Sequence, residues 1–183
     1  MSGMFMLIAG SVLATDLTAH AARAPQGCDQ AGRRVIRDAF EAWRTGKGSI
    51  TDVFAPGVVW RIEGRSAVSK LYRGKQQFVD EVYEPFGARF DRSPTPFRPT
   101  RVHRIFCDTD TMIVYWAGRG VANDGKPYTN SYVWIMRVRA GKVVEGVAFY
   151  DTVAFDDLWR RVTPSTTPAD KPRQESRDAR HRH

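Results

Sequence analysis

Apolar and polar residues alternate most regularly over residues 128–151, YTNSYVWIMRVRAGKVVEGVAFYD. A spacing of two is typical of strands with one buried face, so this stretch predicts two strands joined at Ala140-Gly141. The first strand has a shared face of large residues, namely Tyr128, Asn130, Tyr132, Trp134 and Met136. The second has Val143, Glu145, Val147, Phe149 and Asp151 on one face. Asp151 would then end an apolar row, where a carboxylate must be paired, solvated or used in chemistry.

Helical spacing dominates the earlier part of the chain. From Asp29, apolar residues recur three and four positions apart, which predicts a helix that ends at Gly46 and Gly48. A short helical segment over residues 50–54 and a half-buried strand over residues 58–64 follow it. Residues 66–75 are predicted to be a polar connection into a second helix, which Pro85 should end or bend.

The sequence after residue 88 predicts mainly strands. The proline-rich stretch 89–100 is either a lid over a pocket or an ordinary surface connection. Strands are predicted over residues 101–107 and 111–121, and a last helix over residues 155–162. Helices followed by a run of strands predict an α+β domain over residues 29–162. Its helices would cover one face of a strongly curved antiparallel sheet and enclose a cone-shaped pocket.

Both ends of the chain differ from this domain. Residues 5–14 form an apolar run, and Ala22-Arg23-Ala24 has the small-residue spacing of a cleavage site. Residues 1–27 are therefore either a signal peptide or a flexible N-terminal extension, since the start lacks the usual Lys or Arg. The first reading implies a periplasmic or secreted protein and the second a cytoplasmic one. Residues 163–183 are rich in proline and charge and are predicted to be a disordered tail.

Composition and charge limit the classes of partner that we expect for this chain. The chain of 183 residues carries a formal net charge of +8, but the basic residues form no stripe of the kind that binds nucleic acid. The run over residues 5–14 is too short for stable membrane insertion. No phosphate-binding glycine loop and no metal-ligand spacing occurs, so we expect neither cofactor nor metal. Cys28 and Cys107 either pair in an oxidising compartment or are two unrelated thiols.

Three residues are candidates for acid–base chemistry. Asp151 could act as general base, because apolar neighbours such as Phe149 and Tyr132 disfavour a charged carboxylate. The alternative is a helix cap, because a predicted helix begins shortly after it. His103 could transfer protons near neutral pH or could be a structural or exposed strand residue. Tyr132 could orient a carbonyl oxygen.

Six further residues are candidates for ligand binding. The aromatic ones would give a ligand flat walls with some polar edges, although each could equally be ordinary core. Asn130 could donate a hydrogen bond to a ligand or take part in cross-strand pairing. The set is Trp60, Tyr72, Trp116, Asn130, Trp134 and Phe149.

The chain resembles the nuclear transport factor 2 superfamily, and within it the SnoaL-like and ketosteroid-isomerase-like proteins, over residues 30–160. The resemblance rests on the helix, glycine and short helix before VVWRIEG, on YRGKQQFVDEVYEPF, and on the closing YTNSYVWIMRVRAGKVVEGVAFYDT. It implies a cone-shaped pocket for a small apolar molecule and a homodimer.

The same resemblance leaves the activity open. It implies a cofactor-independent acid–base isomerase, cyclase or hydrolase, and the polyketide-cyclase-like branch would assign Asp151 and His103 to proton transfer. The isomerase-like branch places an aspartate where this chain has Trp60 and Ile62. The hydrolase-like branch would use Arg119, but Asn130 and Ala148 stand in place of its acids. The alternatives are a ligand-binding module without turnover and a dimeric assembly module.

Overall fold

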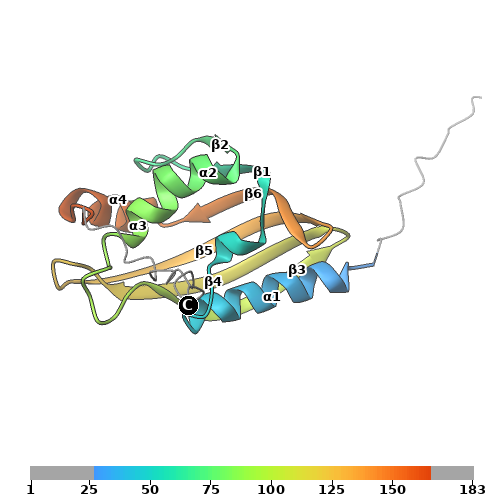
Figure 1. Ribbon diagram of the computed structural model, residues 1–183, viewed down its shortest axis with the longest axis horizontal. Coiled ribbons are helices and arrows are strands. Elements are labelled where there is room, and N and C mark those ends of the chain that lie inside the picture. The colour runs from blue at the N-terminus through green and yellow to red at the C-terminus, as the bar shows by residue number, and fades with distance from the viewer. Residues whose placement is uncertain (1–26, 166–183) are drawn as a thin grey trace, which may run out of the picture.

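The computed structural model describes residues 27–165 (Figure 1). The helical elements are α1 (Gln30–Arg44), η1 (Ile50–Val53), α2 (Lys75–Phe78), η2 (Val79–Tyr83), α3 (Glu84–Gly87) and α4 (Thr152–Arg161). The strands are β1 (Phe54–Ile62), β2 (Leu71–Arg73), β3 (Arg98–Asp108), β4 (Thr111–Val121), β5 (Pro127–Arg139) and β6 (Lys142–Tyr150).

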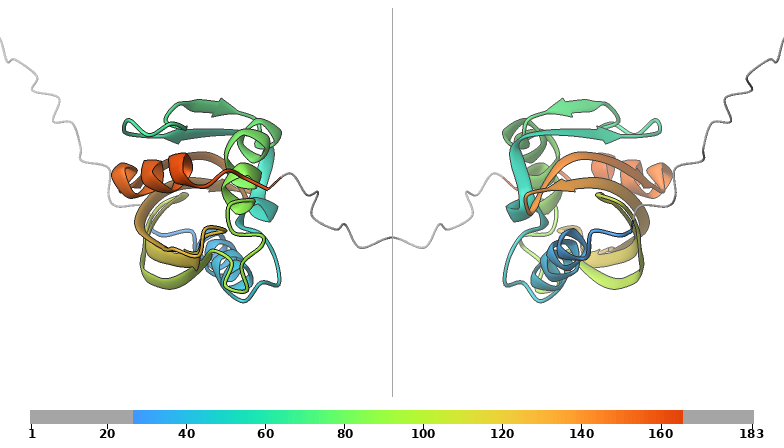
Figure 2. Two further views of the ribbon diagram at one scale, coloured as in Figure 1. Left: turned by 90° about the vertical axis from the view of Figure 1, so that its left-hand side faces the viewer. Right: turned by 90° about the vertical axis from the view of Figure 1, so that its right-hand side faces the viewer.

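The strands form one six-stranded sheet in the order β2-β1-β6-β5-β4-β3. The sheet curves around the helices, with α1 near its β3 end (Figure 2). The predicted α+β fold, a curved sheet packed against helices, is confirmed. One pairing differs from the expected antiparallel pattern, because β1 runs parallel to β6 and makes the sheet mixed.

Helix α1 begins and packs as its sequence predicts. The Asp29 carboxylate accepts a hydrogen bond from the Ala31 backbone N–H at 3.0 Å and caps the helix. Its apolar face is buried, with Ile36, Phe40 and Trp43 among the core residues.

A disulfide between Cys28 and Cys107, with Cα atoms 5.3 Å apart, joins the start of α1 to the end of β3. Next to it, the Asp29 N–H donates to the Thr109 carbonyl at 2.8 Å. The two cysteines therefore pair, which was one of the two alternatives, and they fasten the first helix to the edge strand.

The second helix continues through Pro85 and does not end there. It runs through α2, η2 and α3, and η2 is a single wider turn of π-helix. In that turn the Glu84 N–H donates to the Val79 carbonyl, five residues back. Proline lacks an N–H and crowds the preceding turn, and the wider turn immediately before Pro85 accommodates both effects.

Two segments contain structure that periodicity did not reveal. Residues 71–73 of the predicted polar connection form β2, and Tyr72 in it is buried. Strand β1 starts at Phe54, four residues before the predicted start. Pro56 and Gly57 therefore lie inside the strand. The strand tolerates this proline because its pairing with β6 is irregular between Phe54 and Val59. Helix α4 starts at Thr152 and not at residue 155.

The predicted inner face of β5 is confirmed, since Tyr128, Asn130, Tyr132, Trp134 and Met136 are all buried. The predicted inner face of β6 is wrong beyond Val143. Strand β6 has a register shift, in which Val143 pairs with Val138 but Glu145 pairs with Arg137. Val144 is the extra residue, and one extra residue moves every later side chain to the other face.

The predicted N-terminal segment and the predicted tail lie outside the described residues, except for Gly27 and residues 163–165. Of those, Ser165 donates its backbone N–H to the Ala88 carbonyl at 3.0 Å. None of the helices between residues 27 and 165 has the length and apolar character needed to cross a bilayer.

Candidate functional site

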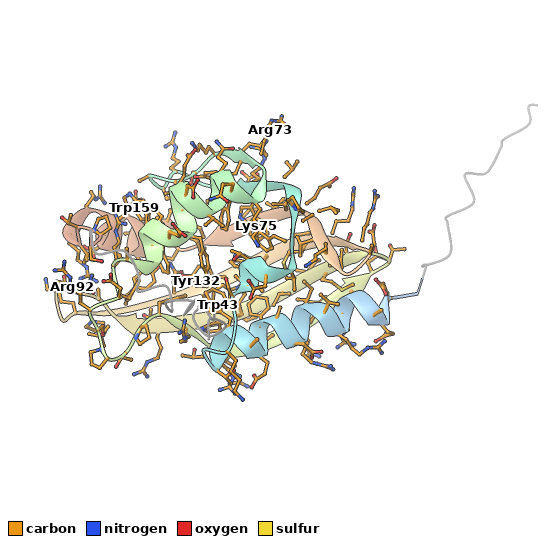
Figure 3. The ribbon with its side chains drawn as sticks, viewed as in Figure 1. Trp43, Arg73, Lys75, Arg92, Tyr132 and Trp159 are labelled. Carbon is orange, nitrogen blue, oxygen red and sulfur yellow. A yellow bond between two sulfur atoms is a disulfide. The ribbon has the colours of Figure 1, made fainter. Side chains whose placement is uncertain are left out.

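A cavity of about 60 Å³ lies between the inner face of the sheet and the helices α1, α2–α3 and α4. Its walls are almost entirely aromatic. The aromatic residues are Trp43, Trp60, Phe78, Tyr83, Phe86, Phe97, Trp116, Tyr132, Trp134, Tyr150 and Phe155, and Ile62, Val82 and Ala148 complete the lining. Figure 3 shows Trp43 and Tyr132 in the interior of the molecule, between α1 and the α2–α3 helix.

The rings are held against one another in fixed orientations. Trp116 on β4 stacks on Tyr132 on β5, with ring centroids 4.0 Å apart and planes 9° from parallel. Trp134 meets Trp116 edge to face, at 5.1 Å and 83°, and meets Trp60 in the same way, at 5.1 Å and 82°. Edge-to-face and stacked pairs are the favourable arrangements of aromatic rings. The walls of the cavity are therefore preorganised without a ligand.

Two polar atoms in these walls have no partner. The indole nitrogens Nε1 of Trp116 and Trp134 are buried and have no hydrogen-bond acceptor among the described residues. An indole N–H can only donate. A buried donor without an acceptor costs stability, so these two nitrogens are an exception among the buried polar groups.

Tyr132 belongs to a hydrogen-bond network that reaches the end of β6. Its hydroxyl lies 3.2 Å from the Tyr128 hydroxyl, which accepts a hydrogen bond of 2.9 Å from the Asn130 amide. The Asn130 oxygen accepts from the backbone N–H groups of Ser131 and Asp151, at 2.8 and 3.1 Å. These two donors fix the orientation of the amide, so its NH₂ group must face Tyr128.

The phenols of the cavity stay protonated at neutral pH. Burial raises the pKa of Tyr132 well above its ordinary value, and the neighbouring Tyr128 hydroxyl raises it further. Burial also raises the pKa of Tyr83 and of Tyr150. All three side chains are therefore neutral and can serve as hydrogen-bond donors, but not as general bases near pH 7.

Four of the predicted site residues come together in this cavity: Trp60, Trp116, Tyr132 and Trp134. Asn130 lies behind Tyr132, through the hydrogen bonds described above, and does not line the cavity. Tyr72 is buried elsewhere, on β2 beside Trp60, where its hydroxyl donates to the Val68 carbonyl at 2.6 Å. Burial raises the pKa of Tyr72 to about 12.

Three further predicted site residues also lie outside the cavity, and all three are exposed, contrary to expectation. Phe149 is 46% exposed on the outer face of the sheet, because of the register shift in β6. His103 is exposed and stacks on Tyr115, with ring centroids 4.4 Å apart. Asp151 is exposed at the start of α4, where its carboxylate accepts from the N–H groups of Val153 and Ala154, at 2.9 and 3.2 Å. The helix-cap alternative therefore describes its position.

A model of the SnoaL-like domain matches residues 36–146, more than half of the chain. The chain belongs to the SnoaL-like domain family. No curated protein matches it in sequence.

Solved structures with the same fold are distant in sequence from this SnoaL-like domain. Bal32a, from a soil-derived mobile gene cassette, has a TM-score of 0.59 and 19% identity, over 71% of this chain and 97% of its own. A Xanthomonas campestris protein of unknown function with a cystatin-like fold has a TM-score of 0.58 and 22% identity, over 70% and 97%. TerC, co-crystallised with polyporic acid, has a TM-score of 0.54 and 19% identity, over 71% and 98%. These likenesses show the shared fold.

Several walls of the SnoaL-like domain's cavity were not among the predicted site residues. Trp43 and Phe155 lie on the apolar faces of α1 and α4, where helical spacing marks them as buried but not as cavity-lining. Phe97 lies in the proline-rich stretch before β3, where no periodicity indicates burial. Tyr150 faces inward because of the same register shift that turns Phe149 outward. Only the three-dimensional packing identifies these residues.

Proposed function

We propose that this SnoaL-like domain binds a small apolar molecule in its aromatic cavity and does not convert it to a product. The observation that carries this proposal is the lining itself. Among the described residues, the cavity is bounded by aromatic and aliphatic side chains, with no carboxylate, imidazole or amine. Acid–base turnover requires a group that takes a proton near neutral pH, and neutral phenols and indoles do not. Asp151 and His103, the two candidates for that role, lie on the outside.

The size of the cavity limits the ligand. Sites for drug-sized molecules measure about 300–1,000 Å³, whereas this cavity measures about 60 Å³. An apolar cavity of about 150 Å³ holds benzene. The ligand is therefore compact, about one ring in size, and its entry moves the walls apart. Phe86 of α3 and Phe155 of α4 stack at 5.8 Å between two separate helices, so they form the wall that can separate without breaking a strand pairing. The TerC complex with polyporic acid supports a ligand in this fold.

Native mass spectrometry of the protein purified from its own host tests this proposal. We expect a retained small molecule that is released unchanged when the protein is denatured. A matched variant, Ala148→Leu, adds volume inside the cavity opposite Trp134 and should lose that molecule. A protein that is empty as isolated and is not stabilised by any small apolar compound would contradict the proposal. Recovery of a chemically altered product after incubation would favour an enzyme.

We propose further that the domain forms a homodimer through the outer face of its sheet. Tyr115, Val133 and Phe149 are paired directly across β4, β5 and β6. Tyr115 is 41% exposed and Phe149 is 46% exposed, so two aromatic side chains flank Val133 on the surface. The neighbouring pairs Ile113–Ile135 and Ile135–Val147 extend this row, which we call the outer apolar row. A second copy could cover it by a twofold axis, which brings the same patch of each subunit together.

We also propose that the protein is exported to the periplasm or the medium. The Cys28–Cys107 disulfide supports this, because such bonds persist in oxidising compartments. Cleavage between Ala22 and Gly27 would leave Cys28 in the mature chain. The N-terminal sequence of the protein isolated from its host tests this proposal, and a cytoplasmic protein with Met1 intact would contradict it.

A further inference from the structure

Arginine side chains gather along one edge of the molecule, where α1 runs beside the edge strand β3 (Figure 1). Residues 33–44 of α1 and 98–106 of β3 together carry seven arginines and one histidine, but only two carboxylates. The Cys28–Cys107 disulfide fixes the start of α1 to the end of β3 and so brings the two segments together. Because they are far apart in the chain, the sequence alone shows no basic stripe. We call residues 33–44 and 98–106 the arginine edge.

A groove of about 410 Å³ lies between α1 and β3 along this edge. Arg37 and Arg44 line it from the helix, and Arg101 lines it from the strand. Arg33 lies one turn before Arg37 and shares its face of the helix. Arg104 is exposed one step further along β3. Guanidinium groups therefore border the groove on both sides.

The two carboxylates of the arginine edge neutralise it only in part. Asp38 pairs with Arg37 at 3.0 Å, and Glu41 pairs with Arg44 at 2.7 Å. These four side chains are between 47% and 67% exposed, and exposed ion pairs of this kind are weak, so an anionic partner can replace them. Three further arginines form no ion pair with any described carboxylate, namely Arg33, Arg101 and Arg104.

The backbone of β3 is poorly suited to pairing with a strand from another molecule. Register shifts in its pairing with β4 leave Thr100 and His103 as extra residues, so two bulges interrupt the strand. Bulges and charged side chains on an edge strand oppose the addition of a further strand. An extended acidic peptide is therefore disfavoured here, whereas a partner that presents phosphate groups needs no backbone pairing.

The aromatic residues of the arginine edge favour a lipid surface over a nucleic acid. Phe106 is 55% exposed, and the Arg104 guanidinium lies 5.8 Å from the centroid of its ring. Among the described residues, Phe40 is the one aromatic side chain in the groove lining, and at 1% exposure it offers no ring face for base stacking. Exposed phenylalanine combined with basic residues is typical of surfaces that lie on a membrane.

We propose that the arginine edge binds the surface of an anionic phospholipid bilayer. Its guanidinium groups bind the lipid phosphates, to which arginine can donate two hydrogen bonds at once, and Phe106 lies in the headgroup region. Each basic residue close to an anionic bilayer adds to the attraction. The binding is peripheral and inserts no helix. It depends neither on the cavity nor on its ligand, and the arginine edge shares no residue with the outer apolar row.

Co-sedimentation of the full chain with lipid vesicles tests this proposal. One set of vesicles is phosphatidylcholine alone, and the other contains about one third phosphatidylglycerol, which supplies the negative charge. We expect the partition coefficient to be at least about tenfold higher for the anionic vesicles. High salt should remove this difference, because it screens the charges. Both comparisons use the unaltered protein, so they stand even where a variant fails to fold.

A triple variant locates the binding surface. Arg37→Gln, Arg101→Gln and Arg104→Gln together should lower the partition coefficient for the anionic vesicles at least about tenfold. Lysine at the same three positions keeps the charge and should keep most of the binding. Circular dichroism checks that both variants are folded.

A second triple variant with the same loss of charge is the control. It combines Arg73→Gln, Arg92→Gln and Arg160→Gln, which change exposed arginines on β2, in the loop after α3 and on α4. Figure 3 shows Arg73 and Arg92 well away from α1. Because these residues lie outside the arginine edge, the control should lower the partition coefficient less than about threefold.

Three results would overturn the proposal. Equal binding to both kinds of vesicle would show that lipid charge does not matter. Equal losses in the two glutamine variants would show that net charge, and not the arginine edge, explains the attraction. Tighter binding to a single-stranded oligonucleotide than to anionic vesicles at the same phosphate concentration would assign the edge to nucleic acid. None of these results bears on the cavity, so the proposed function stands or falls separately.

Discussion

Trp60 and Gly146 are paired across the parallel strands β1 and β6, and the tryptophan ring lies directly over the glycine. A Cβ atom at Gly146 would be 2.2 Å from two carbons of that ring, Cε3 and Cζ3. Such a distance is far shorter than any van der Waals contact. The absence of a side chain at Gly146 therefore sets the position of Trp60, and with it one wall of the cavity.

Gly146→Ala should lower the free energy of unfolding by about 1–3 kcal/mol, the usual cost of overpacking a core. The ring of Trp60 cannot rotate away freely, because Trp134 and Phe54 pack against it. Urea unfolding measures the change. Gly57→Ala is the matched control in the same strand pair, since a Cβ there meets nothing within 4 Å. Equal stability of the two variants would show that Trp60 is not confined by this contact.

Two substitutions at Asp151 distinguish a role as helix N-cap from a role as general base. Asp151→Ala should cost about 1 kcal/mol of stability, because it removes the acceptor for the Val153 and Ala154 N–H groups. Asp151→Asn should cost little, since asparagine is an equally good N-cap residue. Thermal unfolding of the two variants gives the comparison. If Asp151→Asn keeps its stability but abolishes a measured turnover, Asp151 is a catalytic base after all.

The elements that could be predicted from sequence are those with regular periodicity. Helix α1 has one apolar face with a cap before it and glycines after it, and β5 alternates without interruption, so both were placed correctly on their buried faces. Strand β6 differs from β5 by one bulged residue, Val144. A single extra residue is invisible in the apolar pattern, yet it turned Phe149 outward and Tyr150 inward.

The candidate site could be predicted only in part, because only some of its residues lie on elements with regular periodicity. Trp60, Trp116, Tyr132 and Trp134 were found because they lie on regular strands with a definite inner face. Phe97 was missed because it follows a proline-rich stretch, where burial depends on contacts distant in sequence. Phe97 meets Trp43 and Trp116 at ring distances of 6.0 and 6.3 Å, and both partners lie on other elements. Such tertiary contacts leave no local signal.

The disulfide should contribute strongly to stability. It closes a loop with a sequence separation of 79 residues, and cross-linking a loop of that length stabilises a protein by about 2–5 kcal/mol. Reduction should therefore lower the urea midpoint without changing the fold of the sheet. The double variant Cys28→Ser with Cys107→Ser is the control, because a reducing agent should leave its unfolding curve unchanged. An unaltered midpoint on reduction of the natural protein would contradict this prediction.

Alkaline pH should destabilise the domain through its buried tyrosines. The pKa of Tyr72 is raised to about 12 by burial, and that of Tyr132 is raised well above its ordinary value. In the unfolded chain a tyrosine has a pKa of about 10. Below that pH both states hold the proton and stability is constant. As pH rises from about 10 toward 12, the unfolded chain releases protons that the folded chain retains, so the free energy of unfolding falls.

Phenolate absorbance and circular dichroism, followed together during an alkaline titration, check this prediction. Ionisation of the buried tyrosines should coincide with loss of the folded signal. Tyr72→Phe removes one of the groups and should make the decline with pH shallower by up to about 1.4 kcal/mol per pH unit. Ionisation of all the tyrosines in a protein that stays folded would contradict it.

The homodimer predicted from the outer apolar row can be tested at Phe149. Phe149→Lys places a charge at one end of the outer apolar row, where the proposed twofold interface would remove its hydration. The dissociation constant of the dimer should rise at least about tenfold, because an aromatic contact is lost and a charge is buried in its place. Light scattering after size exclusion measures the mass of the particle. Val153→Lys is the control, since Val153 is 77% exposed on α4 and lies outside the row. A monomeric natural protein, or dissociation caused equally by both substitutions, would show that the outer apolar row does not hold two copies together.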